Sequence, residues 1–195
     1  MAIGSPDKTA RLDQLRTYAR VQVRAGFNTA EEIRADVYDA VSEEVKAPAE
    51  AQRLTDDFLS AAHAELALDA ADWPQLTQFD ALQAAFAELE QHDVVILQAC
   101  ADHWAAHDEL QRRAAEGRPV RGIGYFTHSD VWHAVEHQML ELNLWHGTSA
   151  NVAPGDELLD LVLDVLARHG IDSLFDEGRL ELTVSWQRRP VHSPA

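Results

Sequence analysis

Cysteine is almost absent from this 195-residue sequence, because Cys100 is the only one. A single thiol cannot build a disulfide framework, so a disulfide-stabilised secreted scaffold is excluded. Long apolar segments are also lacking: no run approaches the roughly 18 apolar residues of a membrane-spanning helix. The first residues, up to Gln14, contain no apolar segment typical of a signal peptide. We therefore expect a soluble protein from a reducing, cytoplasmic compartment.

Positively charged residues are also few, and Lys8 and Lys46 are the only lysines. The chain has 16 Lys and Arg against 33 Asp and Glu, a formal net charge of -17. A field of that sign repels phosphate backbones and anionic lipid, so we expect neither nucleic acid nor a membrane as partner. It favours association with a basic protein. Arginine in place of lysine, with many alanines, is typical of a GC-rich bacterial genome.

The first half of the sequence reads as helical. Hydrophobic residues make up 46%, enough to form a core and to exclude wholesale disorder. Apolar residues at helical spacing predict helices over residues 8–25, 49–68 and 77–91. A further helix should open at the capping box Thr29-Ala-Glu-Glu32 and end before Pro48. We assign residues 8–91 to a helical N-terminal half of a single domain, 1–195, with a loose end at 1–7.

The second half, residues 92–187, changes to short apolar runs that predict strands over 93–98, 120–127, 140–145 and 179–186. Three helices lie between them: one over 100–116, one that Ser129 or Asp130 caps and that runs to about 138, and one over 156–169. This β-α-β-α-β-α-β order predicts an α+β fold, α/β-like in this half, with a four-stranded mixed sheet. Gly122 and Gly124 inside a strand indicate close backbone approach. Residues 188–195 are expected to form a disordered tail.

Several segments carry a resemblance to a known family. They are Ala25-Gly26-Phe27 with the following Glu-Glu-Ile, the run 79–87, Gly124-Tyr125-Phe126 with His128 and Asp130, Ala134-Val135-Glu136, and the closing Val184-Ser-Trp-Gln-Arg-Arg189. With these the sequence resembles an uncharacterised bacterial family, domain of unknown function 6891. The resemblance implies no established activity. Members typically carry a C-x-x-C pair after the first strand, where this chain has Cys100 and His103, and they do not usually carry histidine at positions 133 and 137.

The motif His133-Ala-Val-Glu136-His137 has the spacing of an inverted zinc-protease signature. Two histidines four residues apart can hold zinc, and the glutamate can act as general base. At about 100° per residue, however, Val131, Ala134, Val135 and Gln138 share the buried side of the helix. His133, His137 and Asp130 then face solvent, and no third ligand can be identified. We interpret the motif as a solvated histidine face.

A second constellation is the better candidate for a metal site. Cys100, His103 and His107 share one face of the expected helix 100–116, and thiolate and imidazole are ligands that zinc prefers. His128 and Asp130 follow the second strand. If the first two strands are parallel, all five residues gather at the carboxyl edge of the sheet. The alternative is a small buried thiol beside hydrogen-bonded histidines.

Catalytic residues cannot be assigned from the sequence. A third option is a Cys100 nucleophile activated by His103 or His128, although no recognisable oxyanion hole or family signature surrounds the cysteine. Trp104, Trp132 and Trp145 are either core residues or anchors for a protein partner. We therefore expect a non-enzymatic protein-binding domain, immunity-like or antitoxin-like, with no cofactor. The alternative is a small zinc-binding domain or metal-dependent hydrolase that uses Cys100, His103, His107, His128 and Asp130.

Overall fold

The computed structural model describes residues 8–190, and the chain divides into two compact units. The helical unit contains residues up to Trp73 together with the segment from Arg188 onward, and the sheet unit contains Pro74–Gln187. The expected loose end, 1–7, and residues 191–195 of the expected tail lie outside the described residues. Residues 188–190, also assigned to that tail, make defined contacts with the helices.

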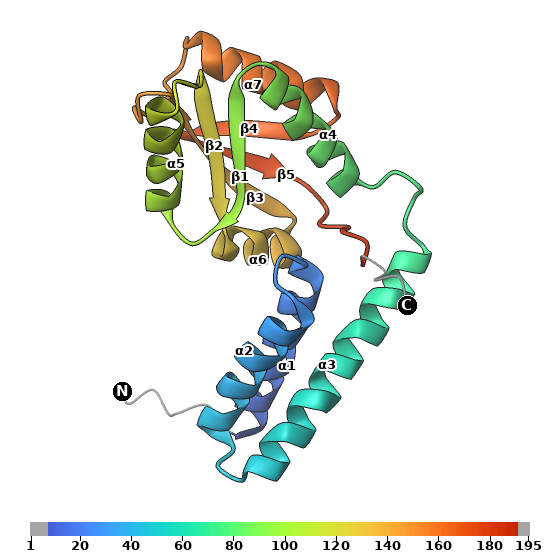
Figure 1. Cartoon of the computed structure of the whole chain (residues 1–195). Helices are drawn as coiled ribbons and strands as arrows, with labels where there is room; N and C mark the ends of the chain where they lie inside the picture. Colours follow the sequence, from blue (N-terminus) through green and yellow to red (C-terminus); the bar gives the residue numbers. More distant parts are fainter. Residues whose placement is uncertain (1–7, 191–195) are drawn as a thin grey trace, which may run out of the picture. The chain divides into compact units, whose positions relative to one another are not determined.

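Three helices form the helical unit: α1 (Lys8–Ala25), α2 (Ala30–Glu44) and α3 (Pro48–Ala71). Each packs against the other two (Figure 1). The capping box that opens α2 is confirmed, since the Thr29 hydroxyl accepts from the Glu32 amide at 3.2 Å and the Glu32 carboxylate accepts from the Thr29 amide at 2.8 Å. The shared core contains Ala19, Val23, Ile33, Val37, Val41, Phe58, Ala62 and Leu66. Within residues 8–190 no helix has the length and apolarity to cross a bilayer.

The sheet unit begins with α4 (Gln78–Gln91), which leads into an alternation of strands and helices. The strands are β1 (Val94–Cys100), β2 (Gly122–Thr127), β3 (Met139–His146), β4 (Asp172–Asp176) and β5 (Arg179–Thr183), and the helices are α5 (His103–Ala115), α6 (His128–His137) and α7 (Glu157–Arg168). The sheet order is β1-β2-β3-β5-β4, with β1 and β2 parallel and every other pair antiparallel. The α+β class is confirmed.

The expectation of four strands is wrong by one, because β4 was missed. This strand is five residues long and has aspartate at both ends, so it lacks the apolar run that marked the others. Its partner β5 follows after the two residues Glu177 and Gly178, whose φ values are +45° and +93°. Two positive φ values in a two-residue loop are the geometry of a tight β-hairpin turn.

One face of the sheet is buried. Leu140, Leu142, Leu144, Leu180 and Leu182 alternate along β3 and β5 and are fully buried. Helices α4 and α7 pack on this side. A Cβ atom on Gly122 would lie 2.6 Å from a Leu158 methyl of α7, and one on Gly124 would lie 2.8 Å from an Ile96 methyl. The close approach expected at both glycines is therefore present.

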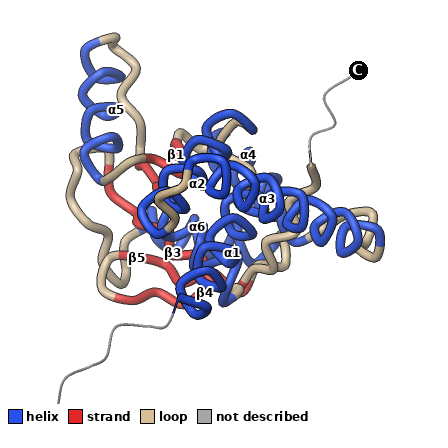
Figure 2. Tube along the Cα trace, turned by 90° about the horizontal axis from the view of Figure 1, so that it is seen from below, coloured by secondary structure: helices blue, strands red, loops and turns tan. Residues whose placement is uncertain are grey.

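Helix α5 packs on the opposite face, over β1 and β2 (Figures 1 and 2). The expected start of this helix at Cys100 is wrong, since β1 continues to Cys100 and Asp102 caps α5 through its carboxylate. A register shift between Leu97 and Cys100 and a positive φ of 52° at Ala99 carry the strand past its expected end. Cys100 thus lies in a strand and does not share a helix face with His103.

Candidate functional site

The outer face of strands β3, β5 and β4 is the most distinctive surface of the sheet unit. Residues paired across strands share a face of a sheet, which places three rows on this side. The rows are Met139–Thr183–Asp172, Glu141–Glu181–Leu174 and Asn143–Arg179–Asp176. Helix α5 packs on the β1 and β2 part of this side, where its core partners are Val95, Ile123 and Tyr125. We call the nine residues of the three rows the acidic sheet face.

Charge is unbalanced on the acidic sheet face, which carries four carboxylates and one cation, Arg179. The Arg179 guanidinium lies 3.2 Å from an Asp176 oxygen and 3.7 Å from a Glu141 oxygen. The negative field of Glu141, together with the hydrogen bond to Asp176, raises the pKa of Arg179 above its usual value. Glu181 pairs directly with Glu141, an arrangement that is unfavourable for like charges. The face therefore offers excess negative potential to a partner.

Apolar surface accompanies this charge. Leu174, at the centre of the edge strand β4, has 64% of its surface exposed. Trp145 of β3 stands on the same side of the sheet, half-buried, with its ring edge-on to Tyr125 at a centroid distance of 4.8 Å. An exposed apolar residue among charges and a partly exposed tryptophan are typical components of protein interfaces.

The three tryptophans expected as partner anchors come from different elements. Trp104, in the first turn of α5, is 59% exposed, whereas Trp132 of α6 is half-buried. Trp145 pairs with Ile123 near the start of β2, while α5 begins just after Cys100, which pairs with Thr127 at the end of β2. Trp104 and Trp145 therefore lie towards opposite ends of β2 and do not form one cluster. Trp145 adjoins the acidic sheet face.

The carboxyl edge of β1 and β2 holds Cys100, at the end of β1, and His128 and Asp130, just after β2. The strands are parallel, and Cys100 pairs with Thr127, the residue that caps α6. The Cys100 sulfur lies 3.4 Å from the carbonyl oxygens of Asp102 and Phe126. Burial, with smaller contributions from the carboxylates of Asp102 and Asp130, raises the pKa of the thiol. A raised pKa keeps the thiol protonated, which disfavours Cys100 as a catalytic nucleophile.

Asp130 has a structural role in this region. The expectation that Ser129 or Asp130 caps α6 is wrong, because Thr127 is the cap. The Asp130 carboxylate accepts from the Thr127 amide at 2.7 Å and from its hydroxyl at 2.8 Å, which completes a capping box. Burial and the nearby Cys100 and Asp130 raise the pKa of Tyr125 to about 12. His128, the first residue of α6, is half-buried.

His103 and His107 both contact Trp104. The centroid of the Trp104 ring lies 4.7 Å from that of His103 and 6.0 Å from that of His107. His107 also lies 3.7 Å from a carboxylate oxygen of Asp108. Within residues 8–190, no three His, Cys, Asp or Glu side chains are grouped as metal ligands.

The protease-like motif lies on α6 as expected. Val131 and Ala134 are buried, and Glu136 and His137 are exposed, while His133 is half-buried. The rings of His133 and His137 contact one another, with centroids 4.7 Å apart. Gln138 was expected on the buried side of this helix and is instead its exposed C-terminal cap, with a φ of 58°.

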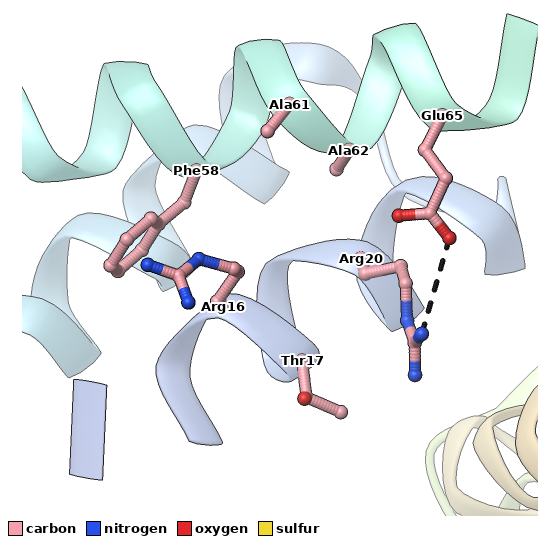
Figure 3. Close-up of a pocket in the computed structure, with 7 residues that line it drawn as sticks. All are labelled: Arg16, Thr17, Arg20, Phe58, Ala61, Ala62 and Glu65. Carbon is pink, nitrogen blue, oxygen red and sulfur yellow. Dashed lines mark ion pairs between the residues drawn. The ribbon is translucent and has the colours of Figure 1, made fainter. Parts of the chain in front are cut away.

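Two of the concave sites of the helical unit differ in charge. The first, a groove of about 120 Å³ between α1 and α3, is shown in Figure 3. There Arg16 lies 5.2 Å from the Phe58 ring and 2.7 Å from Asp13, and Arg20 lies 4.0 Å from Glu65. The arginines of this groove are thus each matched by a carboxylate. The second, about 210 Å³, lies where residues 188–190 meet the helices.

Sequence reasoning missed the acidic sheet face as a site, although part of its signal was present. Polar Glu141 and Asn143 alternate with buried leucines in β3, which marks the outer face of that strand. The contribution of Leu174 and Asp176 could not be seen without β4. The turn residues Glu177 and Gly178 were the local signal for that strand.

The chain matches one family model, described as a domain of unknown function (DUF6891), over residues 8–190. No curated protein matches the chain, and no solved structure matches it. The matched range covers the described residues of both compact units, including the segment 188–190.

Proposed function

The chain belongs to the family described as a domain of unknown function (DUF6891), and we propose that it works as a non-enzymatic, protein-binding domain for a basic partner. The observation that supports this most is the acidic sheet face, with four carboxylates around one arginine and an exposed leucine. Complementary charge speeds encounter with a basic protein and disfavours acidic competitors. The net charge of -17 acts in the same direction.

An inhibitor of the immunity or antitoxin kind is the form of this function that we favour. Such a protein covers a basic site on its target, and carboxylates presented on a rigid sheet suit this task because they need no reordering on binding. Trp145, beside the face, would supply an aromatic anchor. The lone thiol of Cys100 is consistent with a cytoplasmic, reducing location.

A pair of matched triple variants tests the role of the acidic sheet face. Glu141→Gln, Glu181→Gln and Asp172→Asn remove three charges from it and leave the Arg179–Asp176 pair intact. Asp36→Asn, Asp39→Asn and Glu43→Gln remove three exposed charges from α2. In affinity capture from the source lysate at low salt, the wild-type protein and the α2 variant should retain the same stoichiometric partner. The sheet-face variant should lose it.

Two outcomes would overturn the proposal. One is that the wild-type protein captures no partner in stoichiometric amount at low salt. The other is that both triple variants lose the partner equally, because binding would then follow net charge and not this face. Thermal unfolding of each variant establishes that the fold is intact.

The second candidate is a small zinc-binding domain or metal-dependent hydrolase that uses Cys100, Asp130, His128, His103 and His107. The observation in its favour is that the parallel pairing of β1 and β2 brings Cys100 and Asp130 within electrostatic range of each other. Zinc would displace the thiol proton, because the thiolate is the ligand. Elemental analysis of untagged protein after zinc supplementation decides it. About one zinc per chain, lost in Cys100→Ser, supports it, and a content far below one per chain rejects it.

A further inference from the structure

Strand β4 is one edge of the five-stranded sheet, and among the described residues it pairs with β5 alone. Helix α7 contacts it. The other edge strand, β1, is covered, because helices α4, α5 and α6 all contact it. Its residues Val94, Val95 and Ile96 are buried, whereas Leu174 at the centre of β4 is 64% exposed. We call the free side of β4 the open edge.

The backbone bonds that flank β5 show which groups of β4 are directed to the open edge. The Gly178 carbonyl oxygen, before β5, accepts from the Leu144 amide of β3 at 3.4 Å. The Val184 amide, after β5, donates to the carbonyl oxygen of Gln138, which directly precedes β3, at 2.9 Å. Backbone groups alternate in direction along an antiparallel ladder. The odd-numbered residues of 179–183 therefore direct their backbone groups to β4.

Ser173 and Phe175 direct their backbone groups to the open edge. Asp172, Leu174 and Asp176 pair with the odd-numbered residues of β5, so their backbone groups are used within the hairpin. Alternation leaves the amides and carbonyls of Ser173 and Phe175 facing away from β5. Within residues 8–190, no backbone bond joins these two residues to a segment outside the hairpin. An extended segment of another protein can bond to such groups and extend the sheet.

The side chains beside the open edge select the kind of strand that can be added. Asp172, Leu174 and Asp176 alternate on the outer side of β4, with the exposed leucine between two carboxylates. Residues of an added strand would stand opposite them in non-hydrogen-bonded pairs, where side chains approach most closely. Asp176 is shared with Arg179 at 3.2 Å, so Asp172 offers the less compensated charge. The matching strand carries an apolar residue between two basic residues, at alternate positions.

A second copy of this chain fits the open edge poorly. Antiparallel pairing of β4 with itself, centred on Leu174, would place Asp172 of each copy opposite Asp176 of the other. Like charges directly opposite each other destabilise a strand pair. Charged residues on an edge strand protect natural sheets against association of this kind. The carboxylates that reject a second β4 or an acidic strand attract a basic one.

We propose that β4 adds a short basic strand of the partner protein to the sheet. The segment has two basic residues that flank an apolar residue at alternate positions. This inference rests on the proposed function and specifies how the partner is held. Main-chain bonds to Ser173 and Phe175 hold the strand, and contacts with Asp172, Leu174 and Asp176 select its sequence.

The probe is a capped synthetic peptide with the core Lys-Thr-Val-Thr-Lys, whose lysines and valine share one side of an extended strand. A matched peptide carries an N-methyl group on both threonines, whose amides would point to β4. It keeps the charge and the side chains. Chemical-shift titration of the ¹⁵N-labelled full chain at low salt measures both. We expect saturable shifts at the amides of Ser173 and Phe175, and a Kd about tenfold higher for the N-methylated peptide.

A matched pair of protein variants tests the same bonds from the other side. Ser173→Pro removes an amide at the open edge and no bond to β5, and an edge strand accepts proline where its nitrogen faces outwards. Ser173→Ala keeps the amide. The proline variant should raise the Kd of the unmodified peptide about tenfold, and the alanine variant should leave it unchanged. Thermal unfolding establishes that both are folded. The N-methylated peptide gives the answer with wild-type protein alone if the proline variant does not fold.

Several results would overturn strand addition. Equal affinity for the unmodified and the N-methylated peptides would show that charge alone holds the peptide, which leaves the proposed function standing. Retention of the captured lysate partner by Ser173→Pro, with its loss from the sheet-face triple variant, would have the same meaning. The absence of saturable shifts at millimolar unmodified peptide would reject the open edge as a site. A wild-type dimer in sedimentation velocity that Ser173→Pro dissociates would identify a second copy as the occupant.

Discussion

Glu141 and Glu181 stand directly opposite each other on the antiparallel strands β3 and β5, and Arg179 lies 3.7 Å from the first of them. Like charges in this position destabilise a strand pair. The opposite face of these two strands is filled by buried leucines, whereas the outer face carries this unfavourable glutamate pair. The outer surface is therefore not optimised for stability alone. The glutamate pair supplies negative charge for the proposed binding of a basic partner, and it also lowers the stability of the sheet.

Removal of Arg179, the one cation on this face, should destabilise the protein. Arg179→Gln leaves Glu141, Glu181 and Asp176 without compensation, so we expect a lower melting temperature, most clearly at low salt where screening is weak. The double variant Arg179→Gln, Glu181→Gln should recover stability. Thermal unfolding followed by circular dichroism at two salt concentrations measures both. An unchanged melting temperature in the single variant would contradict this account.

The two faces of the β5–β4 hairpin should respond differently to truncation. Leu180→Ala removes a fully buried side chain, and we expect a loss of about 2–5 kcal/mol in the free energy of unfolding. Leu174→Ala, on the neighbouring strand but 64% exposed, should change it by less than about 0.5 kcal/mol. Urea denaturation of the two variants makes the comparison. Equal losses would show that Leu174 is packed and not available to a partner.

Gly147 is expected to tolerate no side chain. A Cβ atom there would lie 2.1 Å from the carbonyl oxygen of Val120, and main-chain atoms cannot move aside as a flexible side chain can. Gly147→Ala should therefore cost about 1–3 kcal/mol through overpacking. Gly117→Asn is the control, since Gly117 has open space around it and a φ of 70° that asparagine tolerates. Chemical denaturation should show it close to the wild type.

The thiol of Cys100 should react slowly with iodoacetamide at neutral pH. Burial raises its pKa, so the reactive thiolate is scarcer than in a free thiol. Mass spectrometry of the alkylated protein over time gives the rate, with glutathione as reference. The same protein in urea should react at about the rate of glutathione, because unfolding exposes the thiol. Faster alkylation of the folded protein than of glutathione would contradict the raised pKa and would support Cys100 as a nucleophile.

The pairing of α4 with the end of α7 should appear as a pH dependence of stability. Hydrogen bonds from Arg168 and then His169 lower the pKa of Glu88 in the folded state. A lowered pKa contributes stability that is fully present above the unfolded value, about 4.3, and is lost as the pH falls through the folded value. Wild-type protein should therefore lose more stability than Glu88→Gln below about pH 4.3.

Glu90→Gln, which removes an exposed carboxylate from the same helix, is the control for this effect and should follow the wild type. Unfolding free energies between neutral pH and pH 3 provide the measurement. An identical acid response in Glu88→Gln and the wild type would mean that Arg168 and His169 do not hold this carboxylate in solution.

Local patterns were sufficient wherever a single element carries its own signal. The capping box at Thr29 and Glu32 set the start of α2, and alternating leucines in β3 indicated which face is buried. The family resemblance was likewise readable, and the family match over residues 8–190 confirms it. These features depend on contacts within a few residues, which periodicity and composition encode directly.

Tertiary structure decided what depends on pairing between distant segments. Cys100 was placed on a helix because nothing near it marks the strand irregularity at Ala99, which lies between the pairs that Leu97 and Cys100 form with β2. The five-residue strand β4 is too short and polar to be recognised without β5, and without it the acidic sheet face is incomplete. Arg188 and Phe27 are far apart in sequence, so only folding shows that they meet. The sequence by itself determined the family, the α+β class and the excess of negative charge. The tertiary structure decided where that charge is concentrated. The register between strands and the contact of residues 188–190 with the helices join distant segments, so local spacing does not specify them.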